Sequence, residues 1–374
     1  MNPQSEHINT NTFKIKVAKH DIIEALRCQQ SVIDKKAIRP IFSHVKLTAQ
    51  DDKLSVEGHD GTMVLIYELD CTVEKSGIIT VPAQLLYNLV RKANGEFVLF
   101  ELNDDIVEVK YGSGIFKLNT LEHSTLPNIP TIKEDACIFE SKFFDLLQYF
   151  KMVKIGMLND EIKTCFNGIY IETKNEAINF VSTDAHRLAM YKTNIKIISE
   201  FNLIISKKTV ETLCNIITTN DEIKCYKEDN QIKFKAKNFT LISRLISGTF
   251  PDYTSIIPKT VEGILESDVS ELKNCLERIS ILSSQISKIV YVELQEKAKI
   301  TSNNVAYGSG EEILPGHYQG TNVTFGIDCN IWMDFLRLFD SGLVRIAYHG
   351  NSKPIVMQHT DFMQFTYIAM PITV

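Results

Sequence analysis

The sequence lacks any hydrophobic run long enough to cross a membrane as a helix. Such a helix needs roughly 18–20 consecutive apolar residues, and every apolar run in this chain is interrupted well before that length. The polar first dozen residues also lack the charged-then-apolar order of a secretory signal. We therefore expect a cytoplasmic protein rather than a secreted or membrane-spanning one.

Motifs that bind metals or cofactors are absent as well. The eight cysteines are scattered, and none forms the close C-x-x-C pair of a zinc ribbon or a redox dithiol. The chain contains no Walker loop, no dinucleotide-binding glycine fingerprint and no G-x-S-x-G nucleophile elbow. We expect reduced thiols, no metal and no cofactor.

The composition is that of a globular protein with more than one domain. The chain has 374 residues, of which 44% are hydrophobic and 23% charged, so it can bury two or three cores. Its net charge of −6 argues against a surface that binds phosphates everywhere. The 40 basic residues can still gather on one face, so nucleic acid is not excluded.

A strand-then-helix pattern occurs three times along the chain. It appears within residues 13–30, 137–154 and 263–282. In each copy an alternating apolar strand leads into a segment whose apolar residues are three or four positions apart, as on one face of a helix. Ser or Asp before the helix is favourable N-cap chemistry.

A second pattern also recurs three times, in the same order. A short strand near residues 78–81, 203–205 and 323–325 precedes a helix, and three further strands follow each helix. Both patterns return after about 125 residues, a length that suits one domain. Three unrelated α+β domains whose elements align by chance would give the same order, but two recurring patterns favour true repeats.

These patterns predict an α+β protein of three tandem repeated domains. Each domain would hold two helices and roughly six to eight mostly antiparallel strands. We place the domains at residues 12–132, 133–258 and 259–374. The joints would fall in the proline-bearing stretches 126–134 and 256–263.

The segment around Asp184, His186 and Arg187 allows three interpretations. Asp and His could transfer protons in a hydrolase that uses a distant serine, with His186 as its base. The same residues could form a polar corner after a strand, with side chains bonded to the backbone. They could also belong to a binding site, and residue types alone do not choose among the three.

Several longer stretches carry a family resemblance. Residues 182–189 (STDAHRLA), 243–253 (SRLISGTFPDY) and 369–372 (AMPI) closely resemble the bacterial DNA polymerase III β subunit. Smaller matches are residues 80–83, 166–168 and 281–283, and together they span nearly the whole chain in the expected order. The resemblance implies two chains joined head to tail as a six-domain ring. Such a ring encircles duplex DNA without sequence preference and performs no catalysis.

The resemblance also implies a pocket that binds short peptides from partner proteins. Those partners would be the catalytic subunit of DNA polymerase III, the clamp-loading ATPase, and other polymerases and ligase. Carried over position by position, the pocket consists of Phe166, Thr183, Ala185, His186, Arg187, Leu188, Pro251, Ile256, Met370, Pro371 and Ile372. Ser255 stands where a basic residue is expected, and Thr373-Val374 replaces a more usual Arg-Leu ending.

Basic residues that would face DNA follow from the same resemblance. Lys207 and Lys208 begin a predicted helix, where the helix dipole disfavours positive charge. Lys35 and Lys36 lie in a predicted loop after the first helix, and Lys163 is a further candidate. A weakly basic inner face on an acidic chain suits a ring that slides, because tight phosphate contacts would hold it in place.

A ring also needs a joint between its two chains. The resemblance assigns Phe116 and Leu118, on a late strand of the first domain, and Ile281 and Leu282, after the first helix of the third. Ordinary core packing of these four residues is the alternative. A peptide-binding scaffold with the same fold and no role on DNA also remains open.

Overall fold

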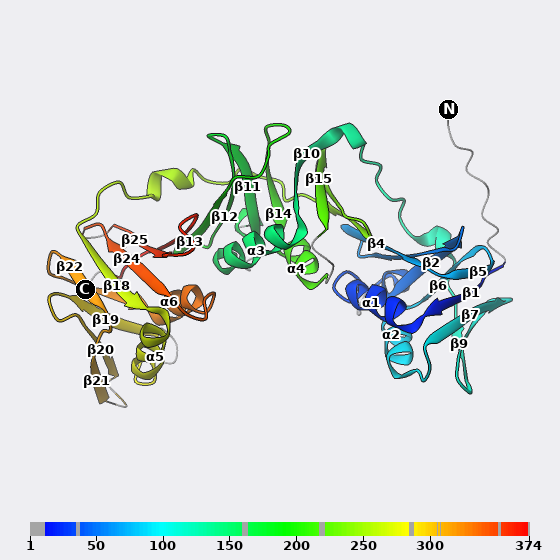
Figure 1. Cartoon of the computed structure of the whole chain (residues 1–374), viewed down its shortest axis with the longest axis horizontal. Coiled ribbons are helices and arrows are strands. Elements are labelled where there is room, and N and C mark those ends of the chain that lie inside the picture. The colour runs from blue at the N-terminus through cyan, green and yellow to red at the C-terminus, as the bar shows by residue number, and fades with distance from the viewer. Residues whose placement is uncertain are drawn as a thin grey trace. The chain divides into compact units, whose positions relative to one another are not determined.

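The computed structural model describes residues 12–34, 38–158, 164–216, 221–283, 288–304, 306, 308–350 and 353–372. The chain divides into two compact units, and Figure 1 labels their helices and strands. Unit 1 contains Met1–Leu147, Lys196–Ser199 and Lys208–Leu245. Unit 2 contains Gln148–Ile195, Glu200–Lys207 and Ile246–Val374.

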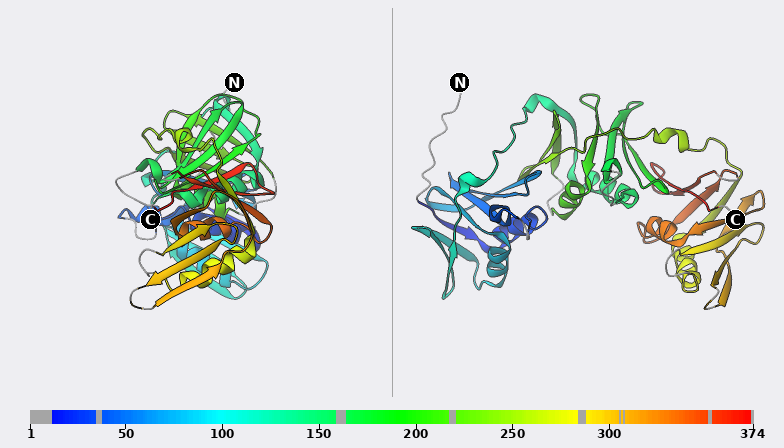
Figure 2. Two further views of the ribbon diagram at one scale, coloured as in Figure 1. Left: turned by 90° about the vertical axis from the view of Figure 1, so that its left-hand side faces the viewer. Right: turned by 180° about the vertical axis from the view of Figure 1, so that it is seen from behind.

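The longer helices come in the order that the sequence predicts, two for each repeat. They are α1 (Lys19–Gln29), α2 (Ala83–Lys92), α3 (Phe143–Val153), α4 (Lys207–Asn215), α5 (Val269–Ser280) and α6 (Cys329–Leu336). Helix α1 packs against α2, and α5 packs against α6 (Figure 2). Within the described residues, none of the helices has the length and apolar character needed to span a bilayer.

Unit 1 holds two antiparallel sheets. The five-stranded sheet has the order β5 (Thr72–Lys75), β1 (Lys14–Ala18), β7 (Phe97–Asn103), β8 (Ile106–Tyr111) and β9 (Gly114–Asn119). The eight-stranded sheet has the order β10 (Cys137–Lys142), β15 (Glu222–Glu228), β16 (Gln231–Lys235), β17 (Phe239–Arg244), β4 (Met63–Asp70), β3 (Lys53–His59), β2 (His44–Gln50) and β6 (Gly77–Pro82).

Unit 2 also holds two antiparallel sheets. The nine-stranded sheet has the order β14 (Asn202–Ser206), β11 (Gly168–Lys174), β12 (Ala177–Thr183), β13 (Arg187–Thr193), β26 (Phe365–Ala369), β25 (Ile355–His359), β24 (Leu343–Tyr348), β18 (Gly263–Asp268) and β22 (His317–Gly320). The four-stranded sheet has the order β21 (Gly308–Ile313), β20 (Lys299–Asn304), β19 (Ile289–Leu294) and β23 (Val323–Asp328).

Strand pairing confirms the predicted repeat. In every repeat the strand before the first helix pairs with the strand after the second helix, as β1–β7, β10–β15 and β18–β24. The strand after the first helix pairs with the strand before the second, as β2–β6, β11–β14 and β19–β23. The three repeats therefore share one topology, as the two recurring sequence patterns predict.

Successive repeats are joined by shared sheets. Strand β4 of the first repeat pairs with β17 of the second, and β13 of the second pairs with β26 of the third. Backbone hydrogen bonds thus cross both repeat boundaries, and the two compact units do not coincide with the three predicted domains. The domain boundaries at 132 and 258 therefore stay a prediction.

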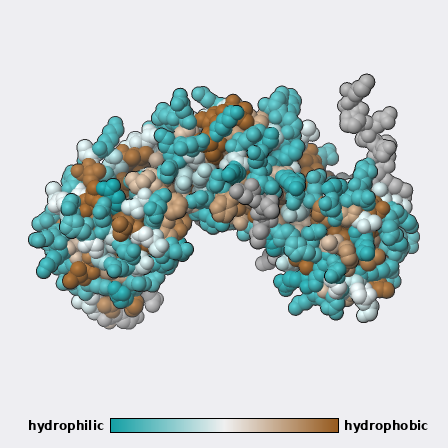
Figure 3. Space-filling model, in the orientation of Figure 1, coloured by the Kyte–Doolittle hydropathy of each residue, from teal (hydrophilic) through white to brown (hydrophobic). Residues whose placement is uncertain are grey.

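Local sequence explains the elements. Strand β2 alternates half-buried and buried residues, the period-two pattern of a strand with one face in the core. Asp268 caps α5, where its carboxylate accepts the backbone N–H of Ser270 at 2.8 Å, and Asp328 caps α6 in the same way. None of the eight cysteines, all of which are among the described residues, forms a disulfide. The space-filling view shows hydrophobic side chains in separate patches on a mostly hydrophilic face (Figure 3).

Candidate functional site

A polar turn connects β12 to β13 in unit 2, and we call residues 183–187 the pocket turn. Its shape is set by Asp184, whose Oδ1 accepts the backbone N–H groups of His186 and Arg187, each at 2.9 Å. The Thr183 hydroxyl donates to the carbonyl of Arg187 at 2.6 Å. Ala185, at the tip, has a φ of +78°. Side chains thus fix a backbone shape that alanine rarely adopts.

The last described residues of the chain lie beside this turn. Strand β26 pairs with β13 so that Ala369 is opposite Arg187, and the Met370 N–H then donates to the His186 carbonyl at 2.9 Å. Ile372 exchanges backbone hydrogen bonds with Gly326 on β23. These bonds hold residues 370–372, which we call the tail, against the pocket turn.

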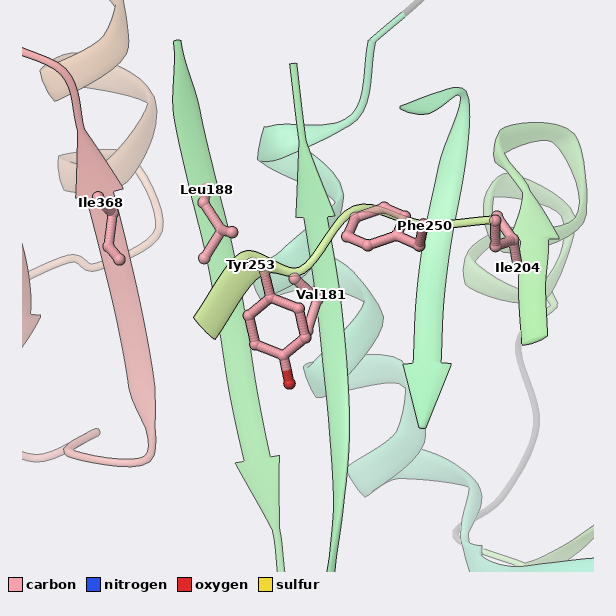
Figure 4. Packing of buried hydrophobic residues seen from close by; sticks show 6 residues of the cluster. All are labelled: Val181, Leu188, Ile204, Phe250, Tyr253 and Ile368. Atoms are coloured by element: carbon pink, nitrogen blue, oxygen red, sulfur yellow. The ribbon is translucent and has the colours of Figure 1, made fainter. Parts of the chain in front are cut away.

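A hydrophobic cluster lies below the turn and the tail. Its buried members come from four strands and from the segment after β17, and they are Val181, Leu188, Ile204, Phe250, Tyr253 and Ile368 (Figure 4). Phe166 and Tyr170 pack against its margin. Phe250 stacks on Tyr170 with ring centroids 4.7 Å apart. Figure 4 shows the segment that carries Phe250 and Tyr253 crossing the strands of the sheet.

The predicted pocket residues occupy both the floor and the rim of this region. Leu188 and Thr183 are buried, and Phe166, Arg187 and Pro371 are half-buried. The remaining six are exposed and are Ala185, His186, Pro251, Ile256, Met370 and Ile372. Met370 and Ile256 stay about as exposed as surface residues, at 40% and 41%. Exposed apolar side chains around a buried apolar floor are what a peptide with hydrophobic anchors needs.

A hydrogen-bond network anchors the segment that crosses the sheet. The Tyr253 hydroxyl donates to Glu172 Oε1 at 2.6 Å and accepts from the Asn179 amide at 3.1 Å. Burial, followed by the bond to Glu172, raises the pKa of the Tyr253 phenol above its ordinary value. Burial and a 3.0 Å bond to the same carboxylate raise the pKa of Tyr170 to about 12. Both phenols therefore stay protonated donors.

Sequence reasoning missed part of the site. Phe250 and Tyr253 lie inside the matched motif at 243–253, yet only Pro251 was assigned from it. Their apolar and aromatic character beside a predicted joint was the available signal. Asp334, which bonds to Arg187, lies 147 residues further along the chain, and no sequence feature marks it.

The geometry does not favour the hydrolase interpretation. Both oxygens of Asp184 are used in the turn, because Oδ2 accepts from Arg187 Nε at 2.9 Å while Oδ1 binds the backbone. Among the described contacts, the exposed His186 ring has no hydrogen bond to a serine or a carboxylate. A base in a catalytic triad needs both partners in reach.

The predicted DNA-facing lysines have different surroundings. Lys35, Lys36 and Lys163 lie outside the described residues. Lys207 is the first residue of α4 and is half-buried. Lys208 donates to Asp60 Oδ2 at 2.6 Å and to the Val32 carbonyl at 3.0 Å. Its charge is therefore partly neutralised within unit 1.

The predicted dimer residues lie near two sheet edges. Phe116 and Leu118 are on β9, which ends the five-stranded sheet. Leu118 is only 5% exposed, so it packs inside its own unit, whereas the neighbouring Ile115 is 60% exposed. Ile281 follows α5 and is 77% exposed, and Leu282 is half-buried.

Comparison with known proteins places the chain in one family. Three family models match it in succession: the N-terminal domain of the DNA polymerase III beta subunit at residues 13–130, the central domain at 143–252 and the C-terminal domain at 254–373. The chain belongs to the DNA polymerase III beta subunit family.

Individual relatives match nearly the whole chain. The beta sliding clamp of Rickettsia felis is 26% identical over 97% of this chain and 100% of its own length. A crystal structure of the Pseudomonas aeruginosa sliding clamp bound to griselimycin has a TM-score of 0.92, with 22% identity over 97% of this chain and 100% of that one. A crystal structure of the C. crescentus beta sliding clamp, with polyethylene glycol bound to its beta-motif tethering region, has a TM-score of 0.90, with 23% identity and the same coverage.

Proposed function

We propose that this chain is a sliding clamp, a non-catalytic processivity factor that encircles duplex DNA as a closed ring of two copies. Its three domains would span residues 12–132, 133–258 and 259–374, and it would act in the cytoplasm. Membership of the DNA polymerase III beta subunit family supports this function. The observation that carries it is the pairing rule between successive repeats.

This pairing rule leaves two edge strands that could pair with a second copy of the chain. The strand that ends the first half of a repeat pairs with the last strand of the next repeat, as β4 with β17 and β13 with β26. In the described part of the chain, the equivalent strands β21 and β9 each lie at the edge of a sheet. If β21 of one copy pairs with β9 of the other, the contact occurs twice and the ring closes at two chains.

The two observed junctions also predict the register of this pairing. Leu65, five residues after the turn aspartate Asp60, is opposite Leu241, the third residue of β17. Ala189, five residues after Asp184, is opposite Tyr367, the third residue of β26. The equivalent turn residue in the third repeat is Asn304, whose Oδ1 accepts the Ala306 N–H at 3.0 Å as the aspartates do. Ser309 of one copy should therefore lie opposite Phe116 of the other.

Side chains at these edges suit such a joint. Ile115 on β9 is 60% exposed and lies within the predicted pairing, which would cover it, and Ile313, at the end of β21, is 72% exposed beside the predicted joint. Phe116 stacks on Tyr111 and extends the apolar surface. Ile281 and Leu282 lie close to β21 in the sequence-predicted interface, since Leu282 approaches Gly310. Leu118, which is buried, would support the joint by packing in the core beneath β9 rather than by contacting the second copy.

DNA would be held by topology rather than by tight contacts. Lys35, Lys36, Lys163 and Lys207 would supply a weak, sequence-independent attraction to phosphates, and the net charge of −6 would keep that attraction small. The ion pair with Asp60 makes Lys208 the weakest of the five candidates.

The candidate pocket would tether partners to the ring. A peptide would insert apolar side chains over Leu188 and between Met370, Ile372 and Ile256, while the pocket turn offers polar groups that fix its register. The partners would be the polymerase III catalytic subunit, the clamp-loading ATPase, other polymerases and ligase. The loader would hydrolyse the ATP.

The deciding experiment measures retention on nicked circular DNA after loading. The protein should stay on circles and leave once the circle is cut to a linear form. An Ile115→Glu variant, which places a charge in the proposed joint, should lose both dimerisation and retention. Equal retention on circular and linear DNA would refute the ring.

Two further variants separate the rival functions. Reversal of Lys35, Lys36, Lys207 and Lys208 to Glu should abolish loading by a clamp but leave a peptide-binding scaffold unaffected. A His186→Ala substitution should only weaken partner binding. Loss of a hydrolytic activity in that variant would instead support the hydrolase.

A further inference from the structure

The pocket turn has a counterpart in the first repeat. Between β3 and β4, Asp60 Oδ1 accepts the N–H groups of Thr62 at 2.7 Å and Met63 at 2.6 Å, as Asp184 does for the two residues at the same offsets. Gly61, in the position of Ala185, has a φ of +88°. The first turn thus uses glycine for a backbone shape that the second turn imposes on alanine.

The second turn is tied to the next repeat by an arginine of its own, whereas the first is tied by Lys208 of α4, which donates to Asp60 Oδ2 at 2.6 Å. Arg187 donates from Nε to Asp184 Oδ2 at 2.9 Å and from Nη1 to Asp334 Oδ2 on α6 at 2.5 Å. Its Nη1 also approaches the Tyr367 hydroxyl at 3.4 Å, and that hydroxyl donates to the Ile331 carbonyl within α6. The equivalent residue in the first turn is Met63, which is buried and uncharged. The arginine therefore ties the turn to a helix of the third repeat.

The tie reaches the rim of the pocket through the backbone. The His186 carbonyl, one residue before Arg187, accepts the Met370 N–H at 2.9 Å. A shift of the turn would therefore move Met370 and the tail. The Arg187 side chain is only 17% exposed, and its Nε and Nη1 are both bonded within the protein.

We propose that Arg187 and Asp334 form a latch that holds the strained pocket turn in its peptide-binding shape. Arg187 is then a positioning residue, and Asp334 a second one that lies outside the predicted pocket. This proposal rests on the proposed peptide-binding function, and it specifies how the affinity of the pocket for a peptide is set. A planar guanidinium suits this role, because its donors, one bonded to each carboxylate, fix orientation as well as distance.

The test compares two matched Asp→Asn substitutions in the full-length chain. Asp334→Asn weakens the latch, and Asp60→Asn weakens the turn of the first repeat, where the carboxylate accepts from Thr62, Met63 and Lys208 and from no predicted pocket residue. The probe is a fluorescein-labelled ten-residue peptide from the organism's own polymerase III catalytic subunit. We expect Asp334→Asn to raise the Kd about tenfold, mainly through faster dissociation, and Asp60→Asn to leave it within about twofold.

Rescue separates positioning from a general loss of structure. Glycine adopts a positive φ without strain, so in an Ala185→Gly background the turn should keep its shape without the latch. Asp334→Asn should then raise the Kd less than about threefold relative to Ala185→Gly alone. Asp334→Glu should recover part of the affinity because it restores the charge.

Three results would overturn the latch. The first is an Asp334→Asn chain that binds the peptide as tightly as the wild type. The second is an Asp60→Asn chain that loses as much affinity, since the effect would then be general destabilisation. The third is a tenfold loss that persists in the Ala185→Gly background. A wild-type chain that binds no peptide, yet is retained on circular DNA, would refute the pocket and the latch together while leaving the ring intact.

Discussion

Two junctions join successive repeats, and both use the same strand pairing. The turns beside them differ. In unit 1, β4 pairs with β17 beside a turn that has glycine at its tip and a lysine on its aspartate. In unit 2, β13 pairs with β26 beside a turn that has alanine at its tip and an arginine tied to a helix. The second junction also presents an exposed apolar rim that includes Met370 and Ile372.

The segments that connect the repeats at the two junctions also differ in what holds them to the sheets. The first connector is residues 126–136. Its Ile132 packs in a small cluster with Tyr226 and Ile242, and hydrogen bonds to a carboxylate also hold it. Glu134 accepts from Tyr226, Lys233 and Lys235. Residues 250–262, the second connector, insert two aromatic side chains into the larger cluster below the pocket. Burial of Phe250 and Tyr253 holds the second connector in place where a partner peptide would contact it.

The largest expected effect comes from emptying the second connector's cluster. Phe250 is 7% exposed and stacked on Tyr170, so Phe250→Ala should destabilise unit 2 by about 3 kcal/mol and abolish peptide binding. The matched change Ile132→Ala should cost about 2 kcal/mol and leave peptide binding intact. Urea unfolding and peptide titration measure the two quantities. Equal loss of binding in both variants would contradict the division of roles.

Removing one hydroxyl from each connector's anchor should have a smaller effect. Tyr253→Phe leaves the buried Asn179 amide and Glu172 without their shared partner, so we expect a loss of about 1–2 kcal/mol and weaker peptide binding. Tyr226→Phe leaves Glu134 bonded to two lysines, and it should cost less than about 1 kcal/mol. A larger loss for Tyr226→Phe, measured by thermal unfolding, would reverse the comparison.

Exchanging the turn tips should change stability in opposite directions. Ala185→Gly removes the strain of a positive φ and should stabilise unit 2 by about 0.5–1 kcal/mol. Gly61→Ala introduces the same strain in unit 1 and should destabilise it by about 1 kcal/mol. An added Cβ at Gly61 would meet only Phe42 at 3.5 Å, an ordinary contact, so conformation alone decides the sign. Calorimetry of both variants checks this prediction.

Features set by local sequence could be predicted, and features set by distant contacts could not. The helices and strands follow from hydrophobic periodicity, and repetition fixed their order. The turn at Asp184 was recognised through a motif. The partners of Arg187 and Lys208 lie 147 and 148 residues away, so no local pattern reveals them. The sequence left open whether Leu118 packs in the core for a related reason, since alternation along β9 does not say which face a second chain covers.

The smallest expected effect is a pH dependence confined to the first connector. Hydrogen bonds from Tyr226, Lys235 and Lys233 lower the pKa of Glu134 to about 2, from an ordinary value of 4.5. A carboxyl with a lowered pKa stabilises the fold above its ordinary pKa, and that stabilisation is lost as the pH falls from 4.5 toward 2. The Glu134 side chain is 65% exposed, so the full contribution should not exceed about 1 kcal/mol. Glu134→Gln should therefore be less stable than the wild type at pH 7, and the difference should vanish near pH 2. Unfolding measured between these values tests the anchor, and a difference independent of pH would show that charge does not hold the first connector.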